Sequence, residues 1–251
     1  MKKKKTLLIG GSGNLGLQII KSKIFKNIYA PRKTFLNLLN PKQINRILKK
    51  NEINTIINCA SIARMKECEK NVGKAINNNI EGTYNLVKAI LEYEKKSKKK
   101  IKLVHISSDA VYSSTKGNYK ENSNLGPYNN YGWTKLSAEY LIKIIENSII
   151  IRTRFYNKND IKYKFSASDI FTSQIEVGLL PKYINYLLKE NYSGIINVGN
   201  KKKSDFEIYK KINPKLKKFK RKDLIRKLKF KIAKDSSLNL KIFNKIKNKY
   251  E

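Results

Sequence analysis

The chain has 251 residues and a formal net charge of +36, and 40% of its residues are hydrophobic. This length allows one large domain or a domain with a smaller lobe, and the apolar fraction excludes a wholly disordered chain. No apolar stretch approaches the ~18 residues of a membrane-spanning helix, and Cys59 and Cys68 do not make a disulfide framework. The Lys run after Met1 precedes too short an apolar segment for secretion, so we expect a cytoplasmic protein.

The positive charge comes almost entirely from lysine. Lys supplies 48 of the 55 positive charges, and Lys, Ile and Asn together make up 111 of the 251 residues. All three have A/T-rich codons, so base composition explains the charge better than a nucleic-acid surface, which uses Arg and aromatic side chains. We therefore expect no nucleic-acid partner and no membrane insertion.

Strands are predicted to alternate with helices through the first 154 residues. The apolar pattern predicts helices after the first glycines, at 41–48, around 76–91 and at 131–145, and strands at 6–9, 27–30, 55–58, 101–107 and 148–153. This alternation is typical of βαβ units. It predicts an α/β fold with a Rossmann-type, doubly wound parallel sheet.

The alternation changes after residue 154. Helices are expected at 171–189, 204–212 and 238–246, with a strand at 194–198. We place a dinucleotide-binding domain with the catalytic residues at 1–154. Residues 155–251 are predicted to form a smaller α/β substrate lobe, whose elements can interleave with the first domain.

Gly10, Gly13 and Gly16 form a G-x-x-G-x-x-G pattern directly after the first predicted strand. The first glycine permits a tight turn, the second lets the backbone approach a pyrophosphate, and the third allows close packing of helix on sheet. Asn14 and Leu15, at the start of the following helix, would offer their amides to phosphate. The pattern predicts a dinucleotide site.

The end of the second strand indicates which dinucleotide binds. An acidic residue there favours NAD, because it binds the ribose hydroxyls. This chain has Arg32 instead, and a cation accepts the 2′-phosphate of NADP, so we favour NADPH and keep NADH as the alternative. Asn37 and Leu38 are expected to line the same cofactor site.

Tyr131 and Lys135 lie four residues apart, which places them on one face of a helix. A free phenol has a pKa near 10, and a nearby ammonium would stabilise the phenolate. Ser108 ends the fourth strand, where its hydroxyl can polarise a carbonyl beside the phenol. The three residues predict a catalytic set for carbonyl chemistry.

These motifs resemble the extended short-chain dehydrogenase/reductase family, most closely its dTDP-4-dehydrorhamnose reductase branch. Segment 36–41 resembles Leu-Asp-Leu-Thr-Asp-Pro, and segment 107–112 resembles Ser-Thr-Asp-Tyr-Val-Phe. Segment 58–61 resembles the family's Asn-x-Ala segment, and residues 152–153 resemble the Arg-Thr that closes its fifth strand.

The resemblance implies NAD(P)H-dependent reduction of a nucleotide-linked 4-keto-6-deoxy sugar, in deoxysugar and surface-polysaccharide precursor synthesis. Tyr131 would protonate the oxygen, Lys135 would tune Tyr131 and hold the ribose, and Ser108 would orient the carbonyl. Asn79 would orient the lysine through a water. Further implied contacts are Asn58, Ala60 and Ser61 with the cofactor, Asp109, Ala110, Arg154 and Phe155 with the substrate, and a pyrophosphate clamp of Arg154, Lys164 and Lys182.

Other functions stay open at this point. Related 4,6-dehydratases carry a Glu where this chain has Ala110, which disfavours dehydration, whereas an NAD-dependent epimerase needs only the same three catalytic residues. The regulatory subunit of methionine adenosyltransferase resembles these reductases yet acts as a binding partner. The single His105 is expected in the core or behind the site. Because the chain has no second histidine and its two cysteines lack ligand spacing, no metal site is predicted. A homodimer through the helices near 84–91 and 131–145 is also expected.

Overall fold

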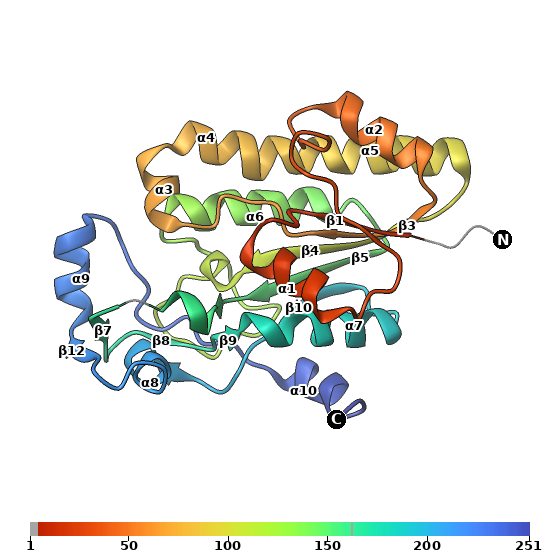
Figure 1. Ribbon diagram of the computed structural model, residues 1–251. Coiled ribbons are helices and arrows are strands. Elements are labelled where there is room, and N and C mark those ends of the chain that lie inside the picture. Colours follow the sequence, from red (N-terminus) through yellow and green to blue (C-terminus); the bar gives the residue numbers. More distant parts are fainter. Residues whose placement is uncertain (1–4, 162) are drawn as a thin grey trace.

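The computed structural model describes residues 5–161 and 163–251 and is built around a six-stranded parallel sheet (Figure 1). The strand order is β10-β5-β4-β3-β1-β2, which confirms the predicted doubly wound sheet. Residues 1–4, with most of the N-terminal Lys run, lie outside the described residues. The strands are β1 (Lys5–Ile9), β2 (Ile28–Tyr29), β3 (Ile53–Asn58), β4 (Lys102–Ser108), β5 (Ser148–Thr153) and β10 (Gly194–Asn197).

Helices cover both faces of this sheet, so its central strands β3, β4 and β5 are buried at almost every position. The helices α2 (Pro41–Lys50), α5 (Gly82–Ser97) and α6 (Asn130–Ile142) cover one face. The other face is covered by α1 (Asn14–Ser22), α7 (Leu180–Lys189) and α10 (Lys241–Lys247). Each layer closes its own apolar core.

The long helix expected around 76–91 is confirmed: the backbone is helical without a break through α4 (Val72–Ile76), a π-helical segment at Asn77–Glu81 and α5. A separate short helix, α3 (Met65–Lys70), precedes it. Asn71 ends α3 and caps α4, because its side chain accepts a hydrogen bond from the backbone of Lys74. Such π segments are rare and often lie at functional sites.

A smaller lobe of short elements lies beyond the carboxyl ends of the strands (Figure 1). The helix expected from residue 171 is wrong over 171–176, where Phe171–Thr172 and Ile175–Glu176 pair as strands. A 3-10 turn at Val177–Leu179 follows, and α7 begins at Leu180 with Pro181 in its first turn. Strand β10 and helices α7 and α10 join the main layers, so the two parts of the chain interleave. The lobe holds β6 (Phe155–Tyr156), β7 (Phe165–Ala167), β8 (Phe171–Thr172), β9 (Ile175–Glu176), β11 (Lys203–Ser204), α8 (Asp205–Lys210), β12 (Lys217–Phe219) and α9 (Arg221–Leu228).

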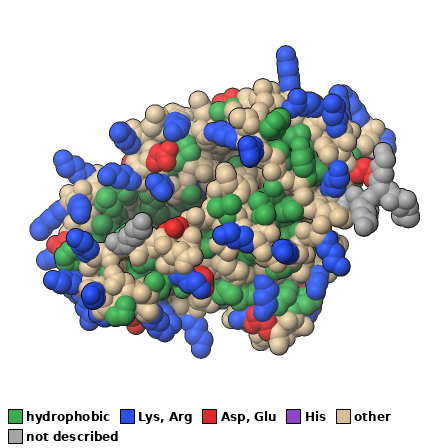
Figure 2. All heavy atoms as spheres, in the orientation of Figure 1, with side chains coloured by type: hydrophobic (Ala, Val, Ile, Leu, Met, Phe, Trp, Pro, Cys, Tyr) green, Lys and Arg blue, Asp and Glu red, His purple; other side chains and the backbone are tan. Residues whose placement is uncertain are grey.

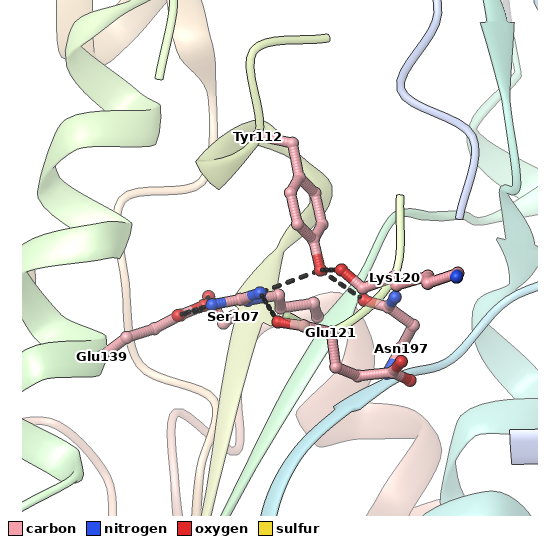
Figure 3. A network of polar contacts seen from close by, with 7 residues as sticks. Ser107, Tyr112, Lys120, Glu121, Glu139 and Asn197 are labelled. Carbon is pink, nitrogen blue, oxygen red and sulfur yellow. Dashed lines mark hydrogen bonds and ion pairs between the residues drawn. The ribbon is translucent and has the colours of Figure 1, made fainter. Parts of the chain in front are cut away.

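A buried polar network ties the last sheet strands to α6 (Figure 3). Arg152 on β5 forms an ion pair with Glu139 on α6 and also donates to the hydroxyl of Tyr112. Ser107 on β4 donates to the same glutamate at 2.5 Å, and Tyr112 donates to Asn197 on β10. Because every partner is hydrogen-bonded, the network holds these elements in one relative position.

The surface carries its positive charge diffusely. Lys and Arg side chains are spread across the face in Figure 2 rather than gathered into one stripe. Among the helices of the described residues, none combines the length and apolarity that crossing a membrane requires.

Candidate active site

A cleft of about 550 Å³ opens where the strand order reverses, between the carboxyl ends of β1 and β3. This switch point is where open α/β sheets bind ligands. Seven residues predicted for the cofactor line the cleft: Gly10, Gly13, Arg32, Asn37, Leu38, Ala60 and Ser61. The other residues predicted for the cofactor are not among those that line the cleft: Asn14, Leu15, Gly16, Asn58, Asn79, Tyr131 and Lys135.

The glycines leave no room for side chains. Gly10 has φ of +82°, and a Cβ there would lie 2.8 Å from the backbone nitrogen of Ala60. At Gly16 a Cβ would lie 2.3 Å from the carbonyl oxygen of Gly10. The first turn and α1 therefore pack directly against each other and against the segment after β3.

The N-terminus of α1 faces this cleft without a side-chain cap. Gly13 is the cap residue, and the first turn contains no acidic side chain. The free amides and the positive end of the helix dipole fit a pyrophosphate, so the geometry suits a dinucleotide. At the other end of the cleft, the lining residues include Arg32, the cation predicted after the second strand, and its neighbour Lys33.

Ser108 and Tyr131 meet across the carboxyl edge of the sheet. Ser108 ends β4, and its hydrogen bond with the Tyr131 hydroxyl lowers the phenol's pKa against the larger effect of burial. Tyr131 lies in the first turn of α6, which Asn129 caps by accepting from the backbone of Gly132 at 2.8 Å. The Gly132 position lets α6 approach closely, because a Cβ there would lie 2.4 Å from the Ala110 carbonyl oxygen.

Burial dominates the ionisation of Tyr131 and Lys135. It raises the pKa of Tyr131 to about 12, so the phenol holds its proton at neutral pH. It lowers the pKa of Lys135 to about 8, although the charge of Glu139 acts in the opposite direction. The pair therefore offers a protonated phenol beside an amine that titrates near neutral pH.

Lys135 is 2% exposed and reaches the sheet behind the cleft. Its Nζ donates to the carbonyl oxygen of Ile106 at 2.7 Å and lies 3.4 Å from Nε2 of His105. Asn58, at the end of β3, accepts from the backbone of Ala60 and contacts the other side of the His105 ring. The expectation that His105 lies behind the site is confirmed.

Asn79 does not reach the cleft wall. Its side chain is 1% exposed, accepts a hydrogen bond from the backbone N–H of Ile62 and donates to the carbonyl oxygen of the same residue. It also donates to Thr134 at 2.9 Å. It therefore fixes the segment after β3 to α6, one residue before Lys135 in the chain. Its neighbour Asn78 lines the cleft instead.

The residues predicted for the substrate lie where the lobe meets the sheet. Asp109 is 2% exposed and accepts from Ser108 at 3.1 Å and from Ser236 at 2.6 Å, so it joins the two parts of the chain. Burial raises its pKa. Ala110 is fully buried, and Phe155 is half-buried against the apolar layer of α7.

Arg154 is the partly exposed cation of this region. Its guanidinium lies 3.7 Å from Asp205 of α8, and the charges of Asp205 and Asp109 raise its pKa despite burial. Gln174 donates to Asp205 at 2.7 Å and so holds it in place. Of the other clamp residues predicted, Lys182 on α7 forms an ion pair with Glu251 at 2.8 Å.

Several site residues were not predicted. The cleft is also lined by Gly11, Ser12, Ile62 and Asn78. The guanidinium of Arg154 is held by Asp205, which in turn accepts from Gln174. Gly11 and Ser12 lie inside the glycine pattern and could have been found there. Asp205 comes from a separate segment, and no local motif marks it.

The fold and this site define an α/β protein of the extended short-chain dehydrogenase/reductase class. Residues 4–164 match the family described as the RmlD substrate binding domain. The chain therefore belongs to the RmlD substrate binding domain family.

Individual proteins in this class show what the chain is similar to. The solved structure of a hypothetical dTDP-4-dehydrorhamnose reductase from Sulfolobus tokodaii has a TM-score of 0.81 and 29% identity, covering 96% of this chain and 94% of that one. A dTDP-D-glucose 4,6-dehydratase from Dictyostelium discoideum is 27% identical over 179 residues, 65% of this chain and 37% of that protein. The methionine adenosyltransferase 2 subunit beta from Bos taurus is 28% identical over 158 residues, 58% and 44% of the two chains. The chain thus matches less than half of the length of these two curated relatives.

Proposed function

We propose that this protein catalyses NAD(P)H-dependent reduction of a nucleotide-linked 4-keto-6-deoxy sugar, in the synthesis of deoxysugar precursors. The observation that carries the proposal is the hydrogen bond between Ser108 and Tyr131 at the carboxyl edge of the sheet, the edge at which the cleft also opens. Lys135 lies one turn further along α6 than Tyr131. The reductase from Sulfolobus tokodaii supports it, because its likeness covers nearly the whole of both chains.

In the proposed reaction, the cleft at the end of β1 would hold the nicotinamide cofactor, whose chemistry when bound would be hydride donation to the carbonyl carbon at position 4 of the sugar. Tyr131 transfers its phenolic proton to the carbonyl oxygen, so the ketone becomes a secondary alcohol. Ser108 donates a hydrogen bond to the same oxygen and orients it. Lys135 binds near the ribose and, when charged, stabilises the phenolate that Tyr131 leaves, which solvent then reprotonates.

We infer that NADPH is the preferred cofactor. Arg32 and Lys33 both line the end of the cleft where the adenosine ribose of a bound dinucleotide would lie. Two cations there favour a 2′-phosphate, and among the residues lining the cleft none is acidic. Arg154, held by Asp205, is proposed to bind the pyrophosphate of the nucleotide sugar.

A 4,6-dehydratase is a weaker candidate, although a dehydratase is among the relatives. Position 110 is an alanine that is 0% exposed, so no carboxylate stands beside Asp109 to remove a second proton. A role as a non-catalytic subunit is favoured by one observation, the likeness to the methionine adenosyltransferase subunit. Catalysis is preferred here because Ser108, Tyr131 and Lys135 are all present and Ser108 is hydrogen-bonded to Tyr131.

We further infer a cytoplasmic homodimer. Large apolar side chains are exposed on the outer faces of α5 and α6, among them Tyr84 at 49%, Trp133 at 54% and Tyr140 at 56%. A second copy would bury them, whereas the +36 charge opposes association at low salt. Light scattering at low and physiological salt tests this, and a monomer at both contradicts it.

Both thiols, Cys59 and Cys68, are free, which fits a reducing compartment.

The decisive experiment follows the oxidation of NADPH and NADH with dTDP- and UDP-linked 4-keto-6-deoxy sugars. Turnover that is lost in Tyr131→Phe supports a 4-ketoreductase and identifies its nucleotide carrier. Tight binding of NADPH without oxidation contradicts the reductase and favours the binding subunit. Conversion of the sugar without net oxidation of the cofactor favours an epimerase.

A further inference from the structure

His105 is the only histidine of the chain and lies between two residues of the candidate site. It sits on β4, 1% exposed. Its Nδ1 is 3.3 Å from Nδ2 of Asn58, and its Nε2 is 3.4 Å from Nζ of Lys135. The ring therefore bridges the end of β3 to the lysine of α6.

The neighbours of the ring determine which nitrogen carries its proton. The backbone N–H of Ala60 can only donate, so Oδ1 of Asn58, at 3.1 Å, must be the atom that faces it. The amide group Nδ2 then faces His105, and since it can only donate, Nδ1 of the imidazole must accept. A neutral imidazole has one proton, which must be on Nε2, the atom that faces Lys135.

This tautomer disfavours a charged lysine. Lys135 already donates to the Ile106 carbonyl, and an ammonium has no lone pair with which to accept from Nε2–H. A neutral amine can donate to Ile106 and accept from His105 at once. Burial acts in the same direction, because it lowers the pKa of Lys135 to about 8 and the pKa of His105 well below 6.5.

The remaining titratable groups around Lys135 come from three elements. Glu139 lies one turn further along α6, and its charge raises the pKa of Lys135. Its carboxylate is already paired with Arg152. Cys59 follows β3 and Cys68 lies on α3, and both thiols are protonated at neutral pH because burial raises their pKa. Among the described contacts, His105 is therefore the one uncharged polar side chain whose N–H faces the Lys135 amine.

We propose that His105 is a positioning residue that, as the Nε2–H tautomer imposed by Asn58, holds the Lys135 amine against the Ile106 carbonyl and opposes its protonation. The geometry stands by itself, whereas the consequence for catalysis rests on the proposed function. Protonation of Lys135 must then disturb the His105 contact, so the imidazole reports the charge of the lysine.

Nitrogen-15 NMR of the whole chain tests this directly, since one histidine gives one pair of ring signals. We expect the Nε2–H tautomer, no imidazolium at neutral pH, and a small shift of the ring signals with a midpoint near pH 8. Lys135→Met should abolish that midpoint. An Nδ1–H tautomer, an imidazolium at pH 7, or the same midpoint in Lys135→Met would overturn the proposal.

Asn58→Asp provides the converse test. A carboxylate at position 58 accepts from both the Ala60 N–H and an Nδ1–H, so the tautomer should invert and free Nε2 to accept from the lysine ammonium. The midpoint should then rise by about one pH unit or more, because the added charge acts in the same direction. Asn54→Asp, on the same strand, is the matched control and should keep the original tautomer. Retention of the Nε2–H tautomer in Asn58→Asp would also overturn the proposal.

Kinetics separates this proposal from the proposed function. If the protein is a reductase, the pH midpoint of kcat should move with the NMR midpoint in Asn58→Asp, and an unmoved kinetic midpoint would contradict the positioning role. If no substrate is turned over, the proposed function fails, and the tautomer and the Lys135-dependent midpoint still decide whether the geometry is as described.

Discussion

Arg152 and Glu139 form a bidentate ion pair in the interior of the protein, with 2.7 Å between Nη2 and Oε2 and 3.0 Å between Nε and Oε1. Both side chains are 1% exposed. The pair joins β5 to α6, one helical turn beyond Lys135, so it helps to fix the position of the helix that carries Tyr131 and Lys135. Figure 3 shows the network around Glu139. Both charges are therefore paired, and the hydroxyls of Ser107 and Tyr112 add hydrogen bonds to Glu139 and Arg152.

Replacing Arg152 with Met should destabilise the protein by about 3–5 kcal/mol, because it leaves Glu139 buried and unpaired. Urea unfolding measures this loss. Lys100→Met is the control, since Lys100 is 68% exposed in its pair with Glu94 and should cost less than ~1 kcal/mol. Replacing both Arg152 and Glu139 with Met should recover part of the stability. Equal losses in Arg152→Met and the control would show that the buried pair is not structurally important.

Tyr131→Phe should lower kcat by about 10²–10⁴-fold, because it removes the proton donor and leaves the cleft intact. The affinity for NADPH, followed by fluorescence titration, should stay unchanged. Tyr84→Phe is the control, since this tyrosine is 49% exposed on α5. A variant that retains full activity would remove Tyr131 from the mechanism.

Gly16→Ala should abolish dinucleotide binding and lower the melting temperature. A Cβ at this position would lie 2.3 Å from a backbone oxygen, so α1 must move away from the first turn. Gly73→Ala is the matched control: it lies in α4 with no atom nearer than 4.0 Å, and it should stabilise the helix by up to ~1 kcal/mol. Similar dinucleotide affinities in the two variants would contradict the proposed phosphate site.

Arg32→Asp should reverse the preference for NADPH. The new carboxylate would repel a 2′-phosphate and accept from the ribose hydroxyls of NADH. Binding of both cofactors to the variant should change their affinity ratio at least ~10-fold. Lys88→Asp makes the same change in charge on the exposed side of α5, and it should leave the ratio alone. If the two variants behave alike, general charge and not position 32 selects the cofactor.

Stability should fall on acidification below about pH 6.5 through His105. Burial lowers the pKa of His105 in the folded chain, so the unfolded chain binds an extra proton below its own value of 6.5. The free energy of unfolding should therefore fall as the pH falls, by up to ~1.4 kcal/mol per pH unit from this residue. Denaturant titrations between pH 7 and 5 should show a shallower slope for His105→Gln than for the native chain. Parallel slopes would mean that the buried imidazole is already charged.

The parts of the site that lie within one short segment could be predicted from the sequence. The glycine pattern is a single strand–turn–helix, and Tyr131 and Lys135 share a helix face, so local geometry determines both. The strand and helix periodicity likewise indicated the parallel sheet. The helix expected at 171–189 forms only from Leu180, because Phe171–Thr172 and Ile175–Glu176 form strand hydrogen bonds with distant segments and so adopt an extended conformation.

The sequence by itself determined the class of fold, the glycine-rich turn and the placement of Tyr131 and Lys135 on one helix face, because each depends on contacts between near neighbours in the chain. Only the tertiary structure decided the partners of the remaining groups. Asp109 meets Ser236 across 127 residues, Arg154 meets Asp205, and Asn58, His105 and Lys135 form a line across three elements. Such contacts depend on how the layers pack, because packing decides which partner lies beside each buried polar group.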